Sequence, residues 1–382
     1  MLRKENAIRA VEETAKKYNL KIDPMAVVGE LSVSQKQKVE ILKVLLRGAK
    51  LLILDEPTAV LTPQETDELF EQLLLLKKND HTIIFISHKI REVMQICDNI
   101  TVLRAGRTVG SIPVANATEE DISRFMVGRD VILKMNKKPA EFGDTLLKVT
   151  DLTYENKEGR KLLDHVSFSL KKGQILGIAG VEGNGQNELA EAIFGFYSGV
   201  KGSILFDGKE ILGKSIRTIR DDGISYIPED RIKTGAAGNI SLWGNMIADI
   251  IDSPLLKKHG LLNYKNIHER ADKLISDFGI LCQNDDQPIG MLSGGNMQKV
   301  VVAREFSSDP KLLIANQPTR GIDVGANEFI WKKIIEQRDA GKGVILISAD
   351  LNEIMELSDS ILVMCGGQAA AYFEDAKKVD EF

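Results

Sequence analysis

Cysteine is scarce in this chain. Its three cysteines, Cys97, Cys282 and Cys365, lie far apart, which excludes a disulfide framework and a zinc site of the usual spacing. No apolar run approaches the length of about 18 residues that spans a bilayer, and residues 1–5 contain no signal-peptide core. The net charge of −5 provides no basic field for nucleic acid. These absences predict a cytosolic protein that binds no nucleic acid.

Length and composition indicate a globular protein with more than one domain. The 382 residues exceed what one hydrophobic core usually covers, and the contents of 43% hydrophobic and 27% charged residues are ordinary. Within residues 131–145, lysines, a proline and a glycine interrupt any apolar period. We therefore expect a first domain at 1–130, a linker at 131–145 and a second domain at 146–382.

One stretch of the sequence occurs twice. Residues 51–58 (LLILDEPT) match residues 312–319 (LLIANQPT) at an offset of 261, and the same offset places His88 on Ala349. Self-similarity at a fixed spacing indicates a duplicated domain. A glycine-rich loop at 180–187 has no counterpart, because its partner at this offset would precede residue 1.

Short apolar strands alternate with helices in both copies. Residues 50–54 and 82–86 have the composition of strands, and 64–78 between them that of a helix, which predicts a parallel sheet covered on both faces. Alternating apolar positions within 149–170 predict antiparallel strands. Residues 234–291 show helical segments and no strands. We expect an α/β fold with a parallel sheet core, an antiparallel β-subdomain and a helical subdomain.

The glycine-rich loop follows an apolar strand at 174–179 and precedes a helix. Glycines there let backbone N–H groups approach phosphates, and a helix N-terminus favours negative charge. The usual phosphate loop ends in a lysine and a hydroxyl residue that serves Mg²⁺; a glutamine and an asparagine stand here. Taken alone, the loop also fits a structural turn. The candidate nucleotide-binding residues are Gly180, Gly183, Asn184, Gly185, Gln186 and Asn187.

Two carboxylates follow the strand at 51–54. An aspartate at this place, Asp55, is suited to hold Mg²⁺, and Glu56 beside it is suited to polarise an attacking water. His88 follows the strand at 82–86, at the end of a parallel sheet where ligands bind. Each feature alone is common in structural roles. Their joint occurrence favours a site for phosphate chemistry.

The string at 292–298 (LSGGNMQ) predicts the start of a helix. Ser293 is placed to cap that helix, while Gly294 and Gly295 let its first amides reach a phosphate. Asn296 completes the first turn. The alternative is a capped helix with no ligand.

These strings together resemble the ATP-binding-cassette (ABC) ATPases, and more closely the fused double-cassette subunit of bacterial importers for simple sugars and nucleosides. The residues that carry the resemblance are 55–64, 180–189, 226–231 and 315–326, and the second and fourth of these strings lean toward the nucleoside-uptake branch. The resemblance implies two tandem P-loop NTPase cassettes that use ATP and Mg²⁺. It also implies two transmembrane permease subunits, an extracytoplasmic solute-binding lipoprotein, and a location at the cytoplasmic face of the cell membrane.

The resemblance further implies roles for single residues, since each ATP would lie between the phosphate loop of one cassette and the signature helix of the other. Tyr154 would stack on adenine, and Glu229 would lie in the loop that senses nucleotide. The hydrolytic site would combine Asp55 for Mg²⁺, Glu56 for the attacking water and His88 for the γ-phosphate with Ser293, Gly294, Gly295 and Asn296 of the other cassette.

The sequence departs from the family pattern in two ways. Gln186, Asn316, Gln317 and Ala349 stand where the family has a lysine, two carboxylates and a histidine. The first cassette would also lack about 115 residues at its front, its phosphate loop included. We therefore expect the chain alone to bind nucleotide weakly and to hydrolyse ATP poorly or not at all. Two alternatives are a truncated remnant that is non-catalytic or regulatory, and a cassette protein that acts on ribosomes.

Overall fold

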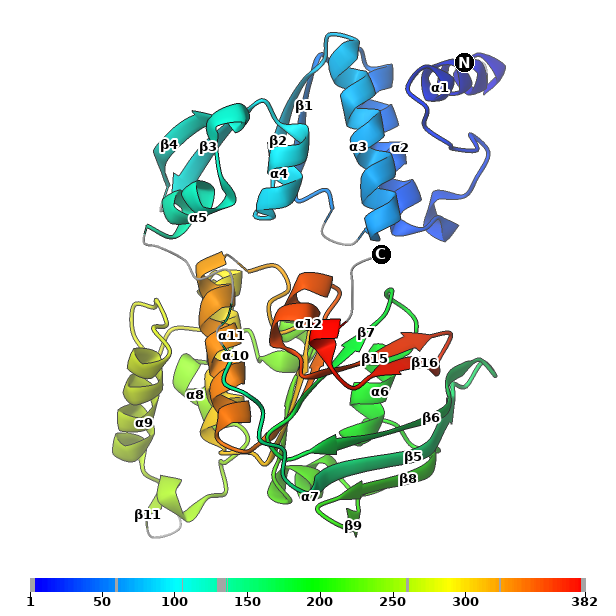
Figure 1. Ribbon diagram of the computed structural model, residues 1–382. Coiled ribbons are helices and arrows are strands. Elements are labelled where there is room, and N and C mark those ends of the chain that lie inside the picture. Colours follow the sequence, from blue (N-terminus) through cyan, green and yellow to red (C-terminus); the bar gives the residue numbers. More distant parts are fainter. Residues whose placement is uncertain are drawn as a thin grey trace. The chain divides into compact units, whose positions relative to one another are not determined.

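The computed structural model divides the chain into two compact units, Met1–Val131 and Ile132–Phe382, called the first unit and the second unit below (Figure 1). The structure describes residues 4–58, 61–104, 106–128, 135, 137–258, 261–322 and 324–378. Met1 and part of the expected linker, at 131–134 and 136, lie outside the described residues. The domain boundaries expected from the sequence stay a prediction.

The second unit is built on a six-stranded sheet. In spatial order its strands are β10 (Ile224–Ile227), β13 (Leu312–Asn316), β14 (Gly343–Ile347), β7 (Ile175–Ala179), β15 (Ser360–Cys365) and β16 (Gln368–Phe373). Neighbours run parallel except β15 and β16. Successive side chains enter opposite cores, with Leu313 and Ala315 on one side and Leu312 and Ile314 on the other. Both faces are thus covered, which explains the unbroken apolar sequences of these strands.

A second sheet is antiparallel, and its strands β5 and β6 precede the loop, as the alternation in 149–170 predicts. Its strands, in spatial order, are β6 (Lys161–Lys171), β5 (Thr145–Glu155), β8 (Lys201–Phe206) and β9 (Lys209–Glu210). The segment expected to hold only helices also contains a short antiparallel pair, β11 (Lys257–Lys258) and β12 (Leu261–Leu262). That detail of the prediction was wrong because strands of two residues are too short to show a period in the sequence.

The second unit also contains seven α-helices within the described residues. They are α6 (Gln186–Ile193), α7 (Ile216–Asp221), α8 (Leu242–Met246), α9 (Tyr264–Asp277), α10 (Gly294–Ser307), α11 (Val324–Asp339) and α12 (Leu351–Leu357). Short 3₁₀ turns are η4 (Pro254–Leu256), η5 (Ile289–Met291) and η6 (Ala376–Lys378), and η3 (Arg231–Gly235) is a π-helical turn.

The first unit repeats half of this plan. Its elements are α1 (Lys4–Lys17), η1 (Val28–Glu30), α2 (Val33–Leu46), β1 (Leu51–Asp55), α3 (Pro63–Lys78), β2 (Thr82–Ile86), α4 (Ile90–Ile96), β3 (Asn99–Arg104), β4 (Arg107–Pro113), η2 (Val114–Asn116) and α5 (Glu119–Val127). At the offset of 261, α1–α4 and β1–β4 fall on α9–α12 and β13–β16, with bounds that agree to within one residue. The offset found in one short string therefore extends over every α-helix and strand described in the first unit except α5.

The two units differ in how completely their sheets are filled. In the second unit β7 hydrogen-bonds to β14 on one side and β15 on the other. Their counterparts β2 and β3 belong to separate two-stranded sheets in the part of the chain that is described. Ile53 on β1 and Ile84 on β2 are 64% and 46% exposed, whereas the equivalent Ile314 and Ile345 are fully buried. Within the described residues, one apolar face of the first unit thus lacks the cover that β7 and its neighbours give the second.

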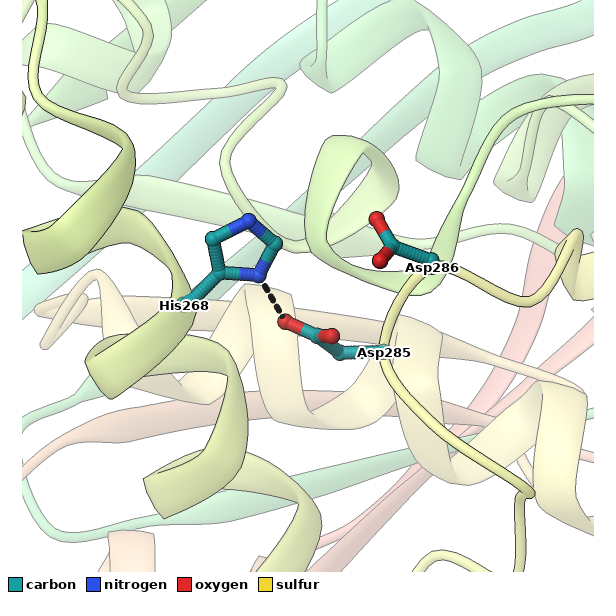
Figure 2. Close-up of side chains that lie close together, drawn as sticks. All are labelled: His268, Asp285 and Asp286. Atoms are coloured by element: carbon teal, nitrogen blue, oxygen red, sulfur yellow. Dashed lines mark hydrogen bonds and ion pairs between the residues drawn. The ribbon is translucent and has the colours of Figure 1, made fainter.

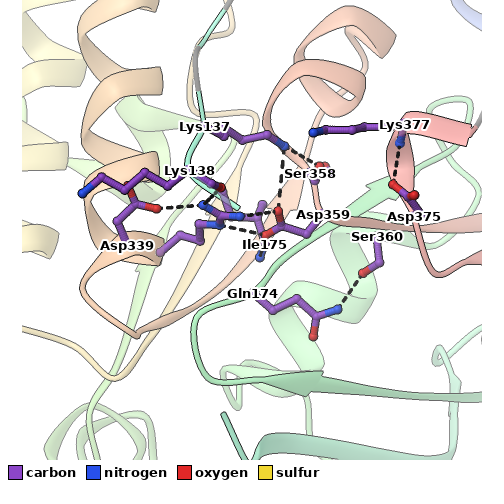
Figure 3. A network of polar contacts seen from close by, with 11 residues as sticks. Lys137, Lys138, Gln174, Ile175, Asp339, Ser358, Asp359, Ser360, Asp375 and Lys377 are labelled. Carbon is purple, nitrogen blue, oxygen red and sulfur yellow. Dashed lines mark hydrogen bonds and ion pairs between the residues drawn. The ribbon is translucent and has the colours of Figure 1, made fainter. Parts of the chain in front are cut away.

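A buried ion pair anchors the start of β7. Asp359 Oδ2 accepts a hydrogen bond of 2.9 Å from the backbone N–H of Ile175, and the Arg338 guanidinium donates to both carboxylate oxygens. Lys137 Nζ donates to the carbonyl of Ser358, beside the same carboxylate (Figure 3). At the offset of 261 Arg338 and Asp359 correspond to Lys77 and Asp98, whose ion pair is exposed. The ion pair at this position is thus buried only in the second unit, where β7 is present.

Candidate functional site

The predicted catalytic pair of the first unit is in contact. Glu56 directly follows β1 with a left-handed backbone (φ 47°), and its N–H donates to the carbonyl of Ile86 at 2.9 Å. His88 follows β2, and its Nδ1 lies 2.8 Å from Glu56 Oε1. Glu56 Oε2 is buried and has no hydrogen-bond partner among the described residues. Asp55 precedes the pair with an exposed side chain. Glu56 and His88 therefore meet at the carboxyl ends of two parallel strands, and Asp55 is the last residue of the first of these strands.

The same backbone in the second unit presents amides. Gln317 has φ 51°, and its N–H donates to the carbonyl of Ile347 at 2.8 Å, which reproduces the geometry of Glu56. Its Oε1 accepts a hydrogen bond of 3.1 Å from the backbone N–H of Ala349, the residue at the position of His88. The strained turn is therefore kept, while the groups suited to activate a water are absent from it.

The glycine-rich loop joins β7 to α6 in the second unit. Gly183 and Gly185 have φ of 88° and 101°, which only glycine adopts without strain. A Cβ at Gly180 would come within 2.7 Å of the Met364 carbonyl, so a larger residue does not fit there. The Asn184 side-chain oxygen accepts a hydrogen bond from the N–H of Gly366 at 2.8 Å. The loop is thus a tight strand–helix turn held against the end of β15.

Gln186 occupies the lysine position at the first turn of α6. Its side chain is 7% exposed, and its Nε2 donates to the carbonyl of Val181 at 3.2 Å, back across the loop. A lysine in this position would present a cation to a phosphate. The neutral amide instead ties the loop to itself.

Asn187, the next residue, starts a chain of polar contacts. Asn316 Nδ2 at the end of β13 donates to Asn187 Oδ1 at 2.7 Å, and Asn187 Nδ2 donates to Glu229 Oε2. The other oxygen of Glu229 accepts from the Arg320 guanidinium. Asn316 also lies 3.4 Å from the Tyr226 hydroxyl. Three separate segments of the second unit thus meet at the predicted nucleotide site.

Mg²⁺, which the sequence resemblance implies together with ATP, fits the two units differently. Asp55 supplies an exposed carboxylate, the usual protein ligand of this ion. At the equivalent place Asn316 and Asn187 are amides that already bond to each other. Glu229 is engaged by Arg320 and Asn187. The described residues at this place in the second unit do not fit the ion.

The predicted signature helix begins where expected. Ser293 Oγ accepts from the N–H of Asn296 and caps α10, and Asn296 Oδ1 accepts from the N–H of Leu281 at 2.9 Å. A Cβ at Gly294 would lie 2.7 Å from the guanidinium of Arg231, which donates to the carbonyl of Arg320 at 2.6 Å. Arg231 therefore lies against Gly294 at the helix start, a position that the sequence alone did not reveal.

Tyr154 lies on β5 and stacks on another aromatic ring. Its ring centroid is 4.4 Å from that of Tyr197, with planes inclined by 18°. The predicted contact with adenine therefore has to use the face of the Tyr154 ring that Tyr197 does not cover.

One buried acid near the turn at Gln317 was missed from the sequence. Glu353 on α12 is 0% exposed, and its Oε1 accepts from the Thr319 hydroxyl at 2.9 Å and from the Trp331 indole at 2.7 Å. Burial raises the pKa of Glu353 to about 7, and nearby Asp350 adds to the rise. The equivalent residue in the first unit is Glu92, which forms an ion pair of 3.0 Å with Lys89. At the offset of 261 Lys89 corresponds to Asp350, so Glu353 has an acid where Glu92 has a cation.

Comparison with known proteins identifies the family. A family model described as ABC transporter matches residues 3–59 and 163–320. The glucose import ATP-binding protein TsgD13 of Haloferax volcanii is 43% identical over 362 residues, and the guanosine import ATP-binding protein NupO of Bacillus subtilis is 41% identical over 368. The chain belongs to the ABC transporter ATPase family.

This ABC chain covers only part of those relatives. The alignments take in 94% and 96% of the chain, but 66% of TsgD13 and 72% of NupO. A nucleotide-free ATP-binding cassette from an ABC transporter, known from its crystal structure, is 26% identical with a TM-score of 0.52 and aligns over 60% of the chain and 91% of its own length. The crystal structure thus matches about one cassette of this chain. Together with the family match, this assigns the chain the α/β P-loop fold of ABC cassettes.

Two further features of the ABC chain are structural. His268, Asp285 and Asp286 lie close together in the helical segment (Figure 2). His268 Nδ1 is hydrogen-bonded to Asp285, which raises the pKa of His268, and the Trp243 indole donates to Asp286 at 2.9 Å. These contacts account for the cluster as a tie between α9 and the loop after it.

None of the described helices is both long and apolar enough to cross a membrane.

Proposed function

We propose that this chain is the ATP-binding subunit that energises import of a simple sugar or a nucleoside. The names of the matched relatives support this substrate class, since they include import proteins for glucose, guanosine and ribose. In this role it lies at the cytoplasmic face of the cell membrane, bound to two transmembrane permease subunits, and a solute-binding lipoprotein delivers the solute from outside. Closure on ATP and reopening after its hydrolysis drive the permease.

We further propose that the two units derive from tandem cassettes. The offset of 261 places the first family match, 3–59, on 264–320, where the second match also ends. The coincidence of helix and strand bounds at the same offset supports this. Among the described residues no strand pairs with both β2 and β3, as β7 does with β14 and β15, and we propose this position for a strand equivalent to β7.

The duplicated turn at Glu56 and Gln317 is the observation that supports different roles for the two units. At one backbone conformation the first unit presents a carboxylate against a histidine, and the second presents an amide against an alanine. We propose that Asp55, Glu56 and His88 serve hydrolysis in the first cassette. The glycine-rich loop of the second unit, with Tyr154 against adenine, binds ATP, and this site does not hydrolyse it.

Affinity purification of the tagged chain from detergent-solubilised membranes of its host tests the transport role. Two integral membrane subunits are expected in stoichiometric amounts, and ATP is expected to alter their association. Recovery only as a chain free of membrane subunits, with no change on adding ATP, would instead favour a regulatory nucleotide-binding fragment. The position between β2 and β3, which no described strand fills, is the observation that supports this second candidate.

A further inference from the structure

The predicted nucleotide site of the second unit contains a guanidinium that is paired with a carboxylate. Glu229 receives hydrogen bonds from Asn187, at the first turn of α6, and from the Arg320 guanidinium. Arg320 follows the turn at Gln317, so it enters the site from the end of β13. A guanidinium has five N–H donors in a planar fork that suits phosphate oxygens, and Glu229 takes one of them. The side chain is 34% exposed, which leaves it within reach of a ligand.

A divalent cation finds few ligands in the same place. Asn316 is 1% exposed, and its amide hydrogens point to Asn187 and Tyr226. The oxygen that Asn187 would offer a metal accepts one of those hydrogen bonds. Asn316 Oδ1 is the buried oxygen here without a partner among the described residues. A single neutral oxygen beside a guanidinium is a poor substitute for the carboxylates that hold Mg²⁺ in proteins.

We propose that the second site binds its nucleotide without a divalent cation, and that the Arg320 guanidinium supplies the positive charge that Mg²⁺ provides elsewhere. The proposal rests on the proposed function, because it requires that the loop at 180–187 binds ATP. Glu229 positions Arg320 through the ion pair, and through its bond to Asn187 it ties that position to the phosphate loop. The phosphates are therefore neutralised by a group that is part of the fold.

The test is equilibrium binding of a fluorescent ATP analogue to the purified full chain, in excess MgCl₂ and in excess EDTA. The expected dissociation constants agree within about threefold. Arg320→Gln is expected to weaken binding about tenfold or more in EDTA, the value of a charge-assisted hydrogen bond. Arg217→Gln is the matched control, because this arginine forms an exposed ion pair with Asp252 and not with Glu229.

A second variant reverses the chemistry. The double change Asn187→Thr and Asn316→Asp restores a hydroxyl and a carboxylate, and it is expected to make binding depend on Mg²⁺, tighter in MgCl₂ than in EDTA by about tenfold. Wild-type binding that is lost in EDTA would overturn the proposal, as would an unchanged affinity of the Arg320→Gln protein. Absence of binding in both buffers would contradict the proposed nucleotide site itself, a different outcome.

Discussion

Glu353 makes the stability of the second unit depend on pH. Its carboxyl is fully buried, and burial raises its pKa from 4.5 to about 7. In the unfolded chain the same group titrates near 4.5. Between these two pH values the folded protein holds a proton that the unfolded chain has lost, so stability falls as pH rises from about 4.5 to about 7 and then levels off. The shift corresponds to about 3 kcal/mol at pH 8.

Glu353→Gln removes this cost. The glutamine oxygen still accepts from Thr319 and Trp331, while its amide group stands in for the protonated oxygen. We expect the variant to be more stable than wild type by up to about 3 kcal/mol at pH 8 and nearly equal at pH 4.5. Urea unfolding followed by tryptophan fluorescence measures this in the second unit alone, because Trp243 and Trp331 are the chain's two tryptophans and both lie there.

Glu92→Gln is the matched control in the first unit. Glu92 has Lys89 as its ion-pair partner, and no tryptophan lies in that unit, so the fluorescence-detected transition should not move at either pH. A Glu353→Gln protein that is destabilised at pH 8, or stabilised equally at pH 4.5 and 8, would refute the reasoning from buried charge.

Three further predictions concern single side chains. Arg338→Ala should cost about 3–5 kcal/mol in urea unfolding because it strands a buried carboxylate, whereas the equivalent Lys77→Ala, at an exposed pair, should cost less than about 1 kcal/mol; equal costs would contradict the account. Tyr154→Ala should weaken ATP binding about tenfold through lost stacking, and Tyr372→Ala, at an exposed ring, should not; a titration with a fluorescent analogue distinguishes them. Glu56→Gln should leave ATP affinity unchanged, since binding is assigned to the other unit.

Much of the fold follows from the sequence because its signals are local. The strand at Thr82–Ile86 and the helix ending at Lys78 have the predicted bounds, since β-branched runs and helical periods are read from neighbouring residues. The contact of Glu56 with His88 was also predictable, because the carboxyl ends of adjacent parallel strands meet. β11 and β12 were missed because so short a pair depends on tertiary contacts.

The electrostatics of the site could not be predicted in the same way. Glu353 has Asp350 three residues before it, where the equivalent Glu92 has Lys89. This difference affects the pKa of Glu353 only once α12 packs on the sheet and buries the carboxyl. The bond from Asn316 to Asn187 joins residues 129 positions apart. Sequence reasoning identified both as amides in carboxylate or hydroxyl positions. It did not show that they satisfy each other.

The most direct test of the account measures ATP binding and phosphate release on the same sample of purified chain, with MgCl₂ present. The account predicts saturable binding of a single nucleotide, with phosphate release in a malachite-green assay no faster than the buffer background. Sustained multiple-turnover release that Glu56→Gln abolishes would contradict it, because the chain would then hold a complete hydrolytic site.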